Sequence, residues 1–466
     1  MRRLAFLLLM VLLVATLSSA QRPNTLDIQY REVAGRLIGA ALVDEGGWEK
    51  LSYLTTRIGN RLSGSATLQQ AVQWVFERMK EERLENPRLQ PVKVPHWVRG
   101  RESARVVAPI EKPLNILGLG GSVATGANGV TAPVVVVGSF DELEALGESK
   151  VKDKIVLYDV PWKGYGETNI YRTSGASRAA RLGAVASIVR SMTGSSLYTP
   201  HTGNQNYSAG VTRIPAAAIT VEEAAWIRRM VESGQEVRVN LQMQAQMLPD
   251  ADSANVVAEI KGRELPDEVV VIGGHIDSWD VGQGAHDDGG GIVAAWQAVT
   301  LMKQLGLRPR RTVRVVAWTN EENGGRGGQA YLASLGSNVA KHVAALEMDD
   351  GVERPLGFRL EMRDGPETSQ YAAARRKLQE IVKLLDVIGA NTIIPGDGGA
   401  DVDPLMRQGV PALGLNTVME HYFDWHHTNA DTLDKVDIQV FRRCIATLAV
   451  TSYVLADMPE TLIPIP

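Results

Sequence analysis

The chain of 466 residues is poor in cysteine and has no excess of positive charge. Its single cysteine, Cys444, excludes an intramolecular disulfide, and its apolar neighbours Ile445 and Leu448 favour a packing role over a catalytic thiol. The formal net charge of −4 gives no electrostatic reason to expect binding to nucleic acid or to an anionic membrane. The search for function therefore turns to local motifs.

A long membrane-spanning run is also missing from the N-terminal segment. Arg2 and Arg3 precede an apolar stretch, 4–17, that is short for a membrane span, and Ser18-Ser19-Ala20 offers small residues for cleavage. A membrane anchor is the less favoured alternative, because the apolar stretch stops early. We therefore predict a signal peptide over 1–20 and a secreted or periplasmic mature protein without a membrane segment.

The length of the chain and the change of composition along it predict more than one domain. With 44% hydrophobic residues the chain can bury a large core. Residues 109–248 contain short β-rich runs with Gly- and Pro-rich joints and one helical piece, 176–182, but no cluster of metal ligands. We predict an inserted domain there, which covers or shapes a site built by 21–108 and 249–466. His201, isolated in a polar loop of the insert, is expected at the surface.

The most informative stretch is EVVVIGGHIDSWDVGQGAHDDGGG, residues 268–291. Its apolar start predicts a buried strand, and His275 and Asp277 follow at the carboxyl end, where open α/β sheets bind ligands. Asp287 comes next, just before a glycine-rich helix start. Imidazole and carboxylate together suit Zn²⁺, and a carboxylate two residues after the histidine can fix its tautomer. The pattern alone leaves open a core histidine beside a solvated acidic loop.

Two more predicted strands end in carboxylates, and a histidine pair follows a fourth. Residues 312–317 lead to Glu321 and Glu322, whose side chains point different ways, so that one can bind a metal while the other acts as general base. Residues 342–346 lead to Asp349. Three consecutive strands thus end in potential ligands, which weakens the alternative of a solvated loop.

These motifs, GGHIDSWD, HDDGGG, TNEENG, EMDDG and WHHTNADT, resemble in order those of the co-catalytic dizinc exopeptidases, most closely the carboxypeptidase Q group. The resemblance covers nearly the whole chain, including the insert, which corresponds to a protease-associated domain. It implies an α/β fold, a three-layer α/β/α sandwich with a mixed sheet, plus this β-rich insert. It also implies two Zn²⁺ per subunit, dipeptide or short peptide substrates, and a homodimer.

The resemblance further assigns roles to seven residues. Asp287 would bridge the two zinc ions. One ion would also take His275 and Asp349, and the other Glu322 and His427. Glu321 would be the general base, and Asp277 would orient His275.

The roles of some residues stay open at this stage. His426 precedes the expected ligand and is a candidate for contact with the ligand shell or the substrate, while Tyr422 could line the pocket. His286 occupies a place where the family would have an uncharged residue, so it could tune the site or face solvent, and it is the third candidate for substrate contact. Asp401 and Asp403 suggest a helix start before Pro404, with proximity to substrate as the second interpretation.

The kind of exopeptidase is open as well. Dipeptidase or carboxypeptidase action is favoured by resemblance, and aminopeptidase action is the alternative. A non-catalytic receptor would be expected to have lost a ligand or Glu321, and a glutaminyl cyclase typically uses a single zinc. Mn²⁺ or Co²⁺ could occupy the same nitrogen and oxygen ligands.

Overall fold

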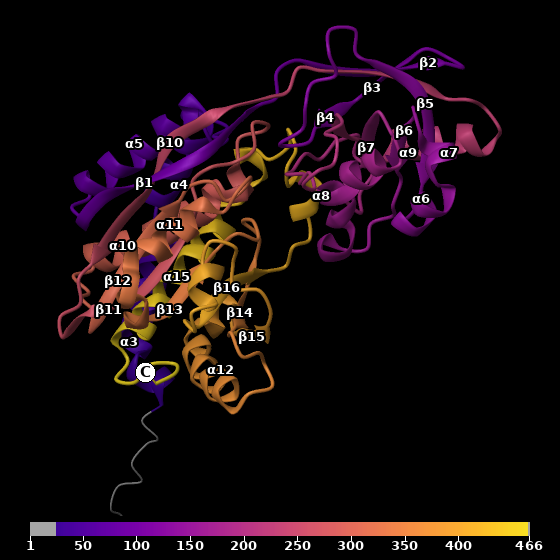
Figure 1. Ribbon diagram of the computed structural model, residues 1–466. Helices are drawn as coiled ribbons and strands as arrows, with labels where there is room; N and C mark the ends of the chain where they lie inside the picture. The colour runs from indigo at the N-terminus through magenta and orange to yellow at the C-terminus, as the bar shows by residue number, and fades with distance from the viewer. Residues whose placement is uncertain (1–24, 465–466) are drawn as a thin grey trace, which may run out of the picture.

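The computed structural model describes residues 25–464 and shows two lobes joined by long strands (Figure 1). The larger lobe combines the N-terminal and C-terminal parts of the chain, and the smaller lobe is made by the middle part. The predicted signal peptide lies outside the described residues.

The larger lobe is organised around an eight-stranded mixed sheet. In spatial order its strands are β1 (Glu85–Val98), β10 (Gln246–Ile260), β12 (Arg311–Trp318), β11 (Leu265–His275), β13 (His342–Glu347), β16 (Ala412–Thr417), β14 (Pro355–Glu361) and β15 (Thr392–Pro395). The four central strands β12, β11, β13 and β16 are mutually parallel. Their carboxyl ends therefore meet at one edge, which is where the predicted ligands follow in sequence.

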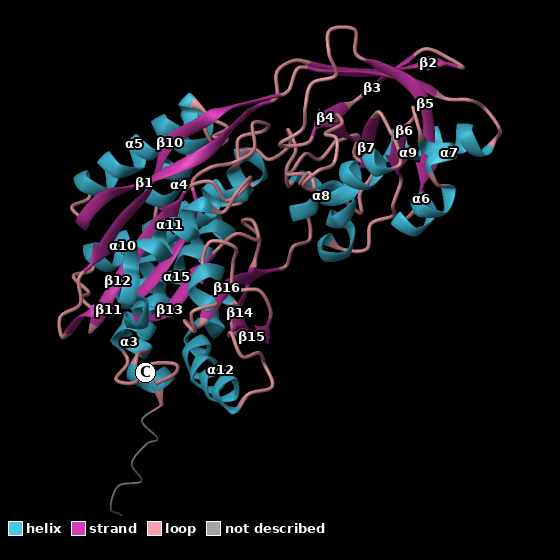
Figure 2. Ribbon diagram, in the orientation of Figure 1, coloured by secondary structure: helices cyan, strands magenta, loops and turns pink. Residues whose placement is uncertain are grey.

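Helices cover both faces of this sheet (Figure 2). They are α2 (Leu26–Gln29), α3 (Arg31–Leu42), α4 (Gly46–Tyr53), η1 (Leu54–Ile58), α5 (Ala66–Glu81), η2 (Ala285–Gly289), α10 (Gly290–Gln304), α11 (Arg326–Leu335), η3 (Gly336–Lys341), α12 (Ser369–Val382), η4 (Lys383–Ile388), α13 (Asp403–Met406), α14 (Tyr422–Trp425), η5 (Leu433–Lys435) and α15 (Ile438–Asp457). Helices α3, α5, α10 and α15 share the larger core, whereas α11 and α13 pack on the opposite face. The predicted α/β/α sandwich with a mixed sheet is confirmed.

Strand β11 shows why this layering forms. Val270 and Ile272 enter the core beneath α10 and α15, while Val269 and Val271 enter the core beneath α11 and α13. Successive side chains of a strand point to opposite faces, so a continuous apolar run buries both. The carboxyl end of β11 is held rigidly by this packing.

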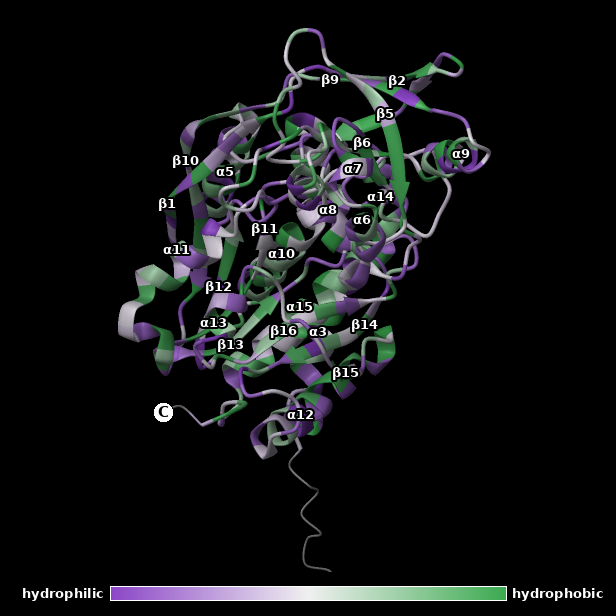
Figure 3. Ribbon diagram, turned by 45° about the vertical axis from the view of Figure 1, so that its right-hand side comes forward, coloured by the Kyte–Doolittle hydropathy of each residue, from purple (hydrophilic) through white to green (hydrophobic). Residues whose placement is uncertain are grey.

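The smaller lobe contains a second eight-stranded sheet. Its strands in spatial order are β3 (Lys112–Leu114), β2 (Glu102–Ala108), β9 (Arg238–Met243), β5 (Val130–Val137), β6 (Ile155–Tyr158), β7 (Ala186–Arg190), β8 (Ala216–Ile219) and β4 (Ile116–Gly118). Its helices are α6 (Phe140–Leu146), α7 (Glu148–Val151), α8 (Tyr165–Arg181) and α9 (Val221–Glu232). The largely hydrophobic β5 stands out in Figure 3.

This lobe holds more helix than the sequence pattern predicted. The expected helical piece 176–182 is the end of the much longer α8, which begins at Tyr165 and whose middle is polar. The lobe is nevertheless built on a sheet, and the predicted β-rich insert is confirmed in that sense. Sheet pairing assigns β2 to this lobe and β10 to the larger one.

One helix of the described chain, α15, is long and apolar enough to cross a membrane by length and composition. Most of its apolar window is buried, 78%, and it packs against α3 and α10. Cys444 lies in this buried helix, as the packing interpretation predicted.

Candidate active site

His275 ends strand β11 and is completely buried. Its Nδ1 lies 2.9 Å from the main-chain carbonyl of Asp277, and the carboxylate of Asp277 is farther away, at 3.7 Å. Because a carbonyl can only accept, Nδ1 carries the proton and Nε2 presents a lone pair. This Nε2 faces two carboxylate oxygens, 3.2 Å from Asp287 Oδ1 and 3.3 Å from Asp349 Oδ1.

His427 occupies the matching position on the other side of Asp287. Its Nε2 lies 3.1 Å from Asp287 Oδ2 and 3.1 Å from Glu322 Oε2. Asp287 therefore directs one carboxylate oxygen to each histidine. The structure brings the five predicted ligands together in two groups that share Asp287.

Main-chain amides and a second carboxylate hold Asp287 in place. The amides of Ala285, His286 and Asp287 all donate to the carboxylate of Asp431, at 2.7–3.2 Å. The neighbouring Asp288 accepts from the amide of His275 at 3.0 Å and from Gly291 at 2.9 Å, and the Asp287–Asp288 peptide bond is cis. Sequence reasoning assigned no role to Asp431 or Asp288, although both lie within quoted motifs, WHHTNADT and HDDGGG.

The donor set fits zinc. His275 Nε2, Asp287 Oδ2 and Asp349 Oδ1 are buried and have no hydrogen-bond partner among the described residues. Lone pairs that face each other in a buried site repel unless a cation lies between them. Two ligands on a tetrahedral zinc ion are roughly 3.3 Å apart, from bonds of about 2.0 Å, which matches the separations across both groups.

Glu321 and Glu322 follow β12 and diverge as expected. Glu322 is buried and turns toward His427, with its other oxygen accepting from the amide of Trp279 at 3.1 Å. Glu321 lines the cavity, and its amide donates to the carboxylate of Asp277 at 3.1 Å. Burial raises the pKa of Glu321 well above its usual range, and the carboxylates of Asp349 and Glu322 raise it further against the lowering effect of His275.

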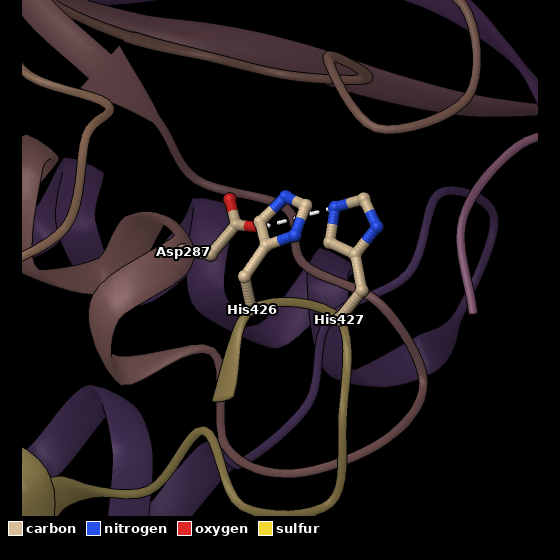
Figure 4. A group of neighbouring side chains, drawn as sticks. All are labelled: Asp287, His426 and His427. Carbon is tan, nitrogen blue, oxygen red and sulfur yellow. Dashed lines mark ion pairs between the residues drawn. The ribbon is translucent and has the colours of Figure 1, made fainter. Parts of the chain in front are cut away.

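The three residues proposed for substrate contact lie in different places. His426 lines the cavity and stacks on His427 with ring centroids 3.6 Å apart, and its Nε2 is 3.5 Å from Asp287 (Figure 4). Tyr422 also lines the cavity, and its hydroxyl lies 3.3 Å from the carbonyl of Asp349. His286 points elsewhere: its Nδ1 accepts from the amide of Val352 at 3.1 Å, and the buried ring does not line this cavity.

The cavity above these groups has a volume of about 490 Å³, and both lobes contribute to it. A volume of this size is ordinary for a small-molecule site. Its walls from the smaller lobe are Tyr165, Arg172, Thr173 and Asn204. The insert therefore forms part of the pocket, as the sequence interpretation expected.

Arg172 is a functional candidate that sequence reasoning missed. The side chain is buried, its Nη2 donates to Tyr165 Oη at 2.6 Å, and its Nη1 donates to the carbonyl of Thr202 at 3.3 Å. Its Nε has no hydrogen-bond partner, and no carboxylate of the described chain pairs with it. The other arginine of the cavity, Arg359, is neutralised by Asp350.

Two other sequence expectations need correction. His201 is buried, not exposed, because its loop turns inward and its Nε2 lies 3.0 Å from the carbonyl of Phe423 in the larger lobe. Asp401 does not cap α13: both of its carboxylate oxygens lack a hydrogen-bond partner within residues 25–464, and its amide donates to Glu347 at 3.0 Å. Pro404 does lie in the first turn of α13.

Comparison with known proteins agrees with this architecture. A family model described as Peptidase family M28 matches residues 255–452, and one described as PA domain matches residues 130–227. Carboxypeptidase Q from Xenopus laevis is 43% identical over 93% of this chain and 91% of that protein, and carboxypeptidase Q from Homo sapiens is 42% identical over 92% and 90%.

Solved structures show the same arrangement. The peptidase M28 precursor from Shewanella amazonensis superposes with a TM-score of 0.89 and 34% identity, covering 94% of this chain and 99% of that one. A zinc aminopeptidase from Bacillus subtilis shares the fold, with a TM-score of 0.66, 18% identity, and coverage of 90% and 97%.

An α/β sandwich with histidine and carboxylate side chains at the ends of parallel strands, beneath a shared cavity, is the arrangement of a metallopeptidase. More particularly, the chain belongs to peptidase family M28 as a carboxypeptidase Q-like member, a metallo-exopeptidase with a protease-associated domain. The predicted resemblance is confirmed.

Proposed function

We propose that the protein is a dizinc exopeptidase that hydrolyses dipeptides or short peptides and binds their free carboxyl end. The observation that carries the proposal is the position of Asp287, whose two carboxylate oxygens face His275 at 3.2 Å and His427 at 3.1 Å. A carboxylate shared in this way can join two metal ions.

The proposed ligands divide into two sets. His275, Asp287 and Asp349 would hold one zinc ion, and Asp287, Glu322 and His427 would hold the other. His427 is preferred to His426 because its Nε2 contacts both Glu322 and Asp287 at 3.1 Å, whereas His426 reaches only Asp287, at 3.5 Å. When bound, such a pair of ions supplies Lewis acidity and lowers the pKa of water toward about 7.

Glu321 is the proposed general base. It lines the cavity beside the proposed ligands and forms no ion pair with a histidine of the described chain, so its carboxylate remains free for proton transfer. In our proposal Glu321 takes a proton from the attacking water and passes it to the leaving amine of the substrate. Asp277 fixes the position of Glu321 through the main-chain amide at 3.1 Å, and it orients His275 through its own carbonyl.

Arg172 supports carboxypeptidase or dipeptidase action over aminopeptidase action. A buried guanidinium without a carboxylate partner is costly unless an anion from outside completes it. In our proposal the free carboxylate of the substrate does so, since Arg172 lines the same cavity as Glu321. An aminopeptidase has no need of such a cation, because its substrates extend beyond the cleaved residue.

A panel of three peptides tests this function. We would measure hydrolysis of a free dipeptide, of the same dipeptide acetylated at its amino end, and of the same dipeptide amidated at its carboxyl end, each with and without chelator. Loss of cleavage on amidation, together with loss on chelation and recovery with Zn²⁺, is the expected result. Equal cleavage of the amidated peptide would identify an aminopeptidase and remove the proposed role of Arg172.

The Arg172→Gln variant adds a matched comparison. Loss of one charged hydrogen-bonding partner, worth about 3 kcal/mol, is expected to reduce kcat/KM for the free dipeptide by roughly 10²-fold and to reduce kcat/KM for the amidated peptide much less. An equal reduction for both peptides would mean that Arg172 acts on the site in another way.

Further proposals concern the protein as a whole. The resemblance supports a homodimer, which light scattering would detect, and the leader-like residues 1–20 support secretion to the periplasm or the exterior, which fractionation would detect. We also propose the division of the chain into the segments 21–108 and 249–466 and an insert at 109–248; the two separate sheets support such a division, although the pairing of β2 moves the start of the insert a few residues earlier.

A further inference from the structure

Arg61 is a charged residue to which the sequence motifs assign no role. It lies in the turn between η1 and α5 and is completely buried, with a side-chain exposure of 0%. Its guanidinium donates four hydrogen bonds, and all four acceptors are main-chain carbonyls. In the described part of the chain no carboxylate lies within ion-pair distance of it.

The positions of these carbonyls are informative. Arg61 Nε donates to Ile276 at 2.8 Å, directly after the proposed ligand His275. Nη1 donates to Gln283 at 2.8 Å and Nη2 to Gly284 at 3.0 Å, directly before the segment that carries Asp287. The remaining bond, from Nη1 to Gly59 at 2.6 Å, fixes the guanidinium to its own turn.

The main chain of Arg61 contacts the middle of the same loop. Its amide donates to Ser278 Oγ at 3.0 Å, and its carbonyl accepts from the amide of Ser278 at 3.3 Å. One residue therefore holds the beginning, the middle and the end of the loop 276–284. That loop connects His275 to Asp287, whose separation decides whether both can face one ion.

The charge of Arg61 matters as well as its shape. Asp431, Asp277 and Asp288 are among the buried carboxylates that stabilise its positive charge through space. In return the guanidinium offsets part of the mutual repulsion of these carboxylates. A lysine would keep the charge, but its compact ammonium cannot reach carbonyls at both ends of the loop, because only a planar fork presents donors in several fixed directions.

We propose that Arg61 is a positioning residue of the metal centre, whose guanidinium fixes the loop 276–284 so that His275 and Asp287 are held at ligand distance. This inference rests on the proposed ligand set. Arg61 does not line the substrate cavity, so its effect reaches the reaction only through the ligands.

The test compares Arg61→Lys and Arg61→Met with Arg57→Met, a matched control on the exposed face of η1 in the same segment. Zinc affinity is measured by competition with a chromogenic chelator, alongside kcat, KM, and melting temperatures with and without zinc. Both Arg61 variants are expected to bind zinc roughly 10- to 100-fold more weakly than the wild type, with lower kcat and unchanged KM. Arg57→Met is expected to match the wild type.

A different pattern would overturn the inference. If the Arg61 variants had lower melting temperatures with and without zinc but wild-type zinc affinity, Arg61 would serve only general stability. If they did not fold, Ser278→Ala would test whether the attachment of the loop 276–284 to Arg61 matters for the metal, since it removes the acceptor of the Arg61 main-chain amide and leaves the four guanidinium bonds intact. A severalfold weaker zinc affinity of Ser278→Ala supports the inference, and an unchanged affinity contradicts it.

The zinc stoichiometry of the wild type separates this inference from the proposed function. Two ions per chain would support the ligand set, whatever the Arg61 variants do. Fewer than two would contradict the dizinc proposal itself.

Discussion

Thr202 of the insert and His427 of the larger lobe contact each other through both main-chain polar groups of Thr202. The amide of Thr202 donates to the carbonyl of His427 at 2.9 Å, and the carbonyl of Thr202 lies 3.3 Å from His427 Nδ1, which is also 3.3 Å from Arg172 Nη1. When His427 binds a metal through Nε2, its Nδ1 carries the proton and the carbonyl of Thr202 accepts it. His427 also has a positive φ of 62°, which is unusual for a residue with a side chain and which the contact helps to hold.

This relationship predicts that Thr202→Pro weakens zinc binding. Proline has no amide proton, so one of the two contacts is lost and His427 is less firmly oriented. We expect zinc affinity to fall by roughly 10-fold or more, as is typical when the partner of a ligating histidine is removed. Chelator competition would measure the change.

Thr202→Val is the matched control. It keeps both main-chain contacts and loses only the hydroxyl, which donates to the carbonyl of Gly118 at 2.7 Å. We expect a stability loss of about 1 kcal/mol in urea unfolding and wild-type zinc affinity. Equal zinc affinity of the proline and valine variants would show that the contact between the lobes does not orient His427.

Glu321→Gln is predicted to separate catalysis from metal binding. Glutamine has nearly the same shape but cannot accept the proton, so kcat should fall by roughly 10²- to 10⁴-fold. Because Glu321 is not a proposed ligand, elemental analysis should find the wild-type zinc content. If the variant lost zinc as well, Glu321 would be a metal ligand, and Glu322 would then be the candidate for the general base.

Gly291→Ala is predicted to disturb the support of His275. A methyl group at Gly291 would collide with the carbonyl of Met348 and with the carboxylate of Asp288, which accepts from the amide of His275. We expect a stability loss of about 1–3 kcal/mol together with weaker zinc binding. The control is Gly35→Ala on the exposed face of α3, where a methyl group has open space and should stabilise the helix by roughly 0.5–1 kcal/mol.

The layered fold and the location of the site could be predicted because both depend on local pattern. The continuous apolar run before His275 marks a strand buried on both faces, and the polar residues that follow it must lie at its carboxyl end. The same reasoning applies to β12 and β13. Glycines at the end of β11 and at the start of α10 let the chain approach closely there, as at Gly291.

The contacts that complete the site could not be predicted, because they join residues distant in sequence. Arg172 and His427 are 255 positions apart, and Arg61 and Gly284 are 223 apart. No sequence signal distinguishes an arginine whose guanidinium is buried from one whose side chain is solvated. The inward turn of the loop that buries His201 was missed for the same reason.

His342 predicts a dependence of stability on pH that is separate from the metal centre. It lies at the opposite end of β13 from the proposed ligands, where its Nε2 lies 2.9 Å from the hydroxyl of Tyr331 and its Nδ1 lies 3.2 Å from the carbonyl of Asn338. The neutral ring satisfies both contacts by accepting from the hydroxyl and donating to the carbonyl. Burial, with a further contribution from Arg314, lowers the pKa of His342 to about 4.

The direction of the effect follows from the two protonation equilibria. Unfolded histidine has a pKa of about 6.5, so between pH 6.5 and 4 the unfolded chain binds more protons than the folded one. The contribution of His342 is therefore fully present above about pH 6.5 and is lost as the pH falls toward 4, by about 3 kcal/mol in total.

Urea unfolding of the wild type and of His342→Gln from pH 7 to 4.5 would measure this dependence. Both proteins contain the same zinc ligands, so the difference between their unfolding free energies isolates His342. We expect the advantage of the wild type to shrink as the pH falls, since glutamine does not titrate. A difference that stayed constant over this range would show that His342 is equally protonated in the folded and unfolded chains, and the buried contact with Tyr331 would then not require a neutral ring.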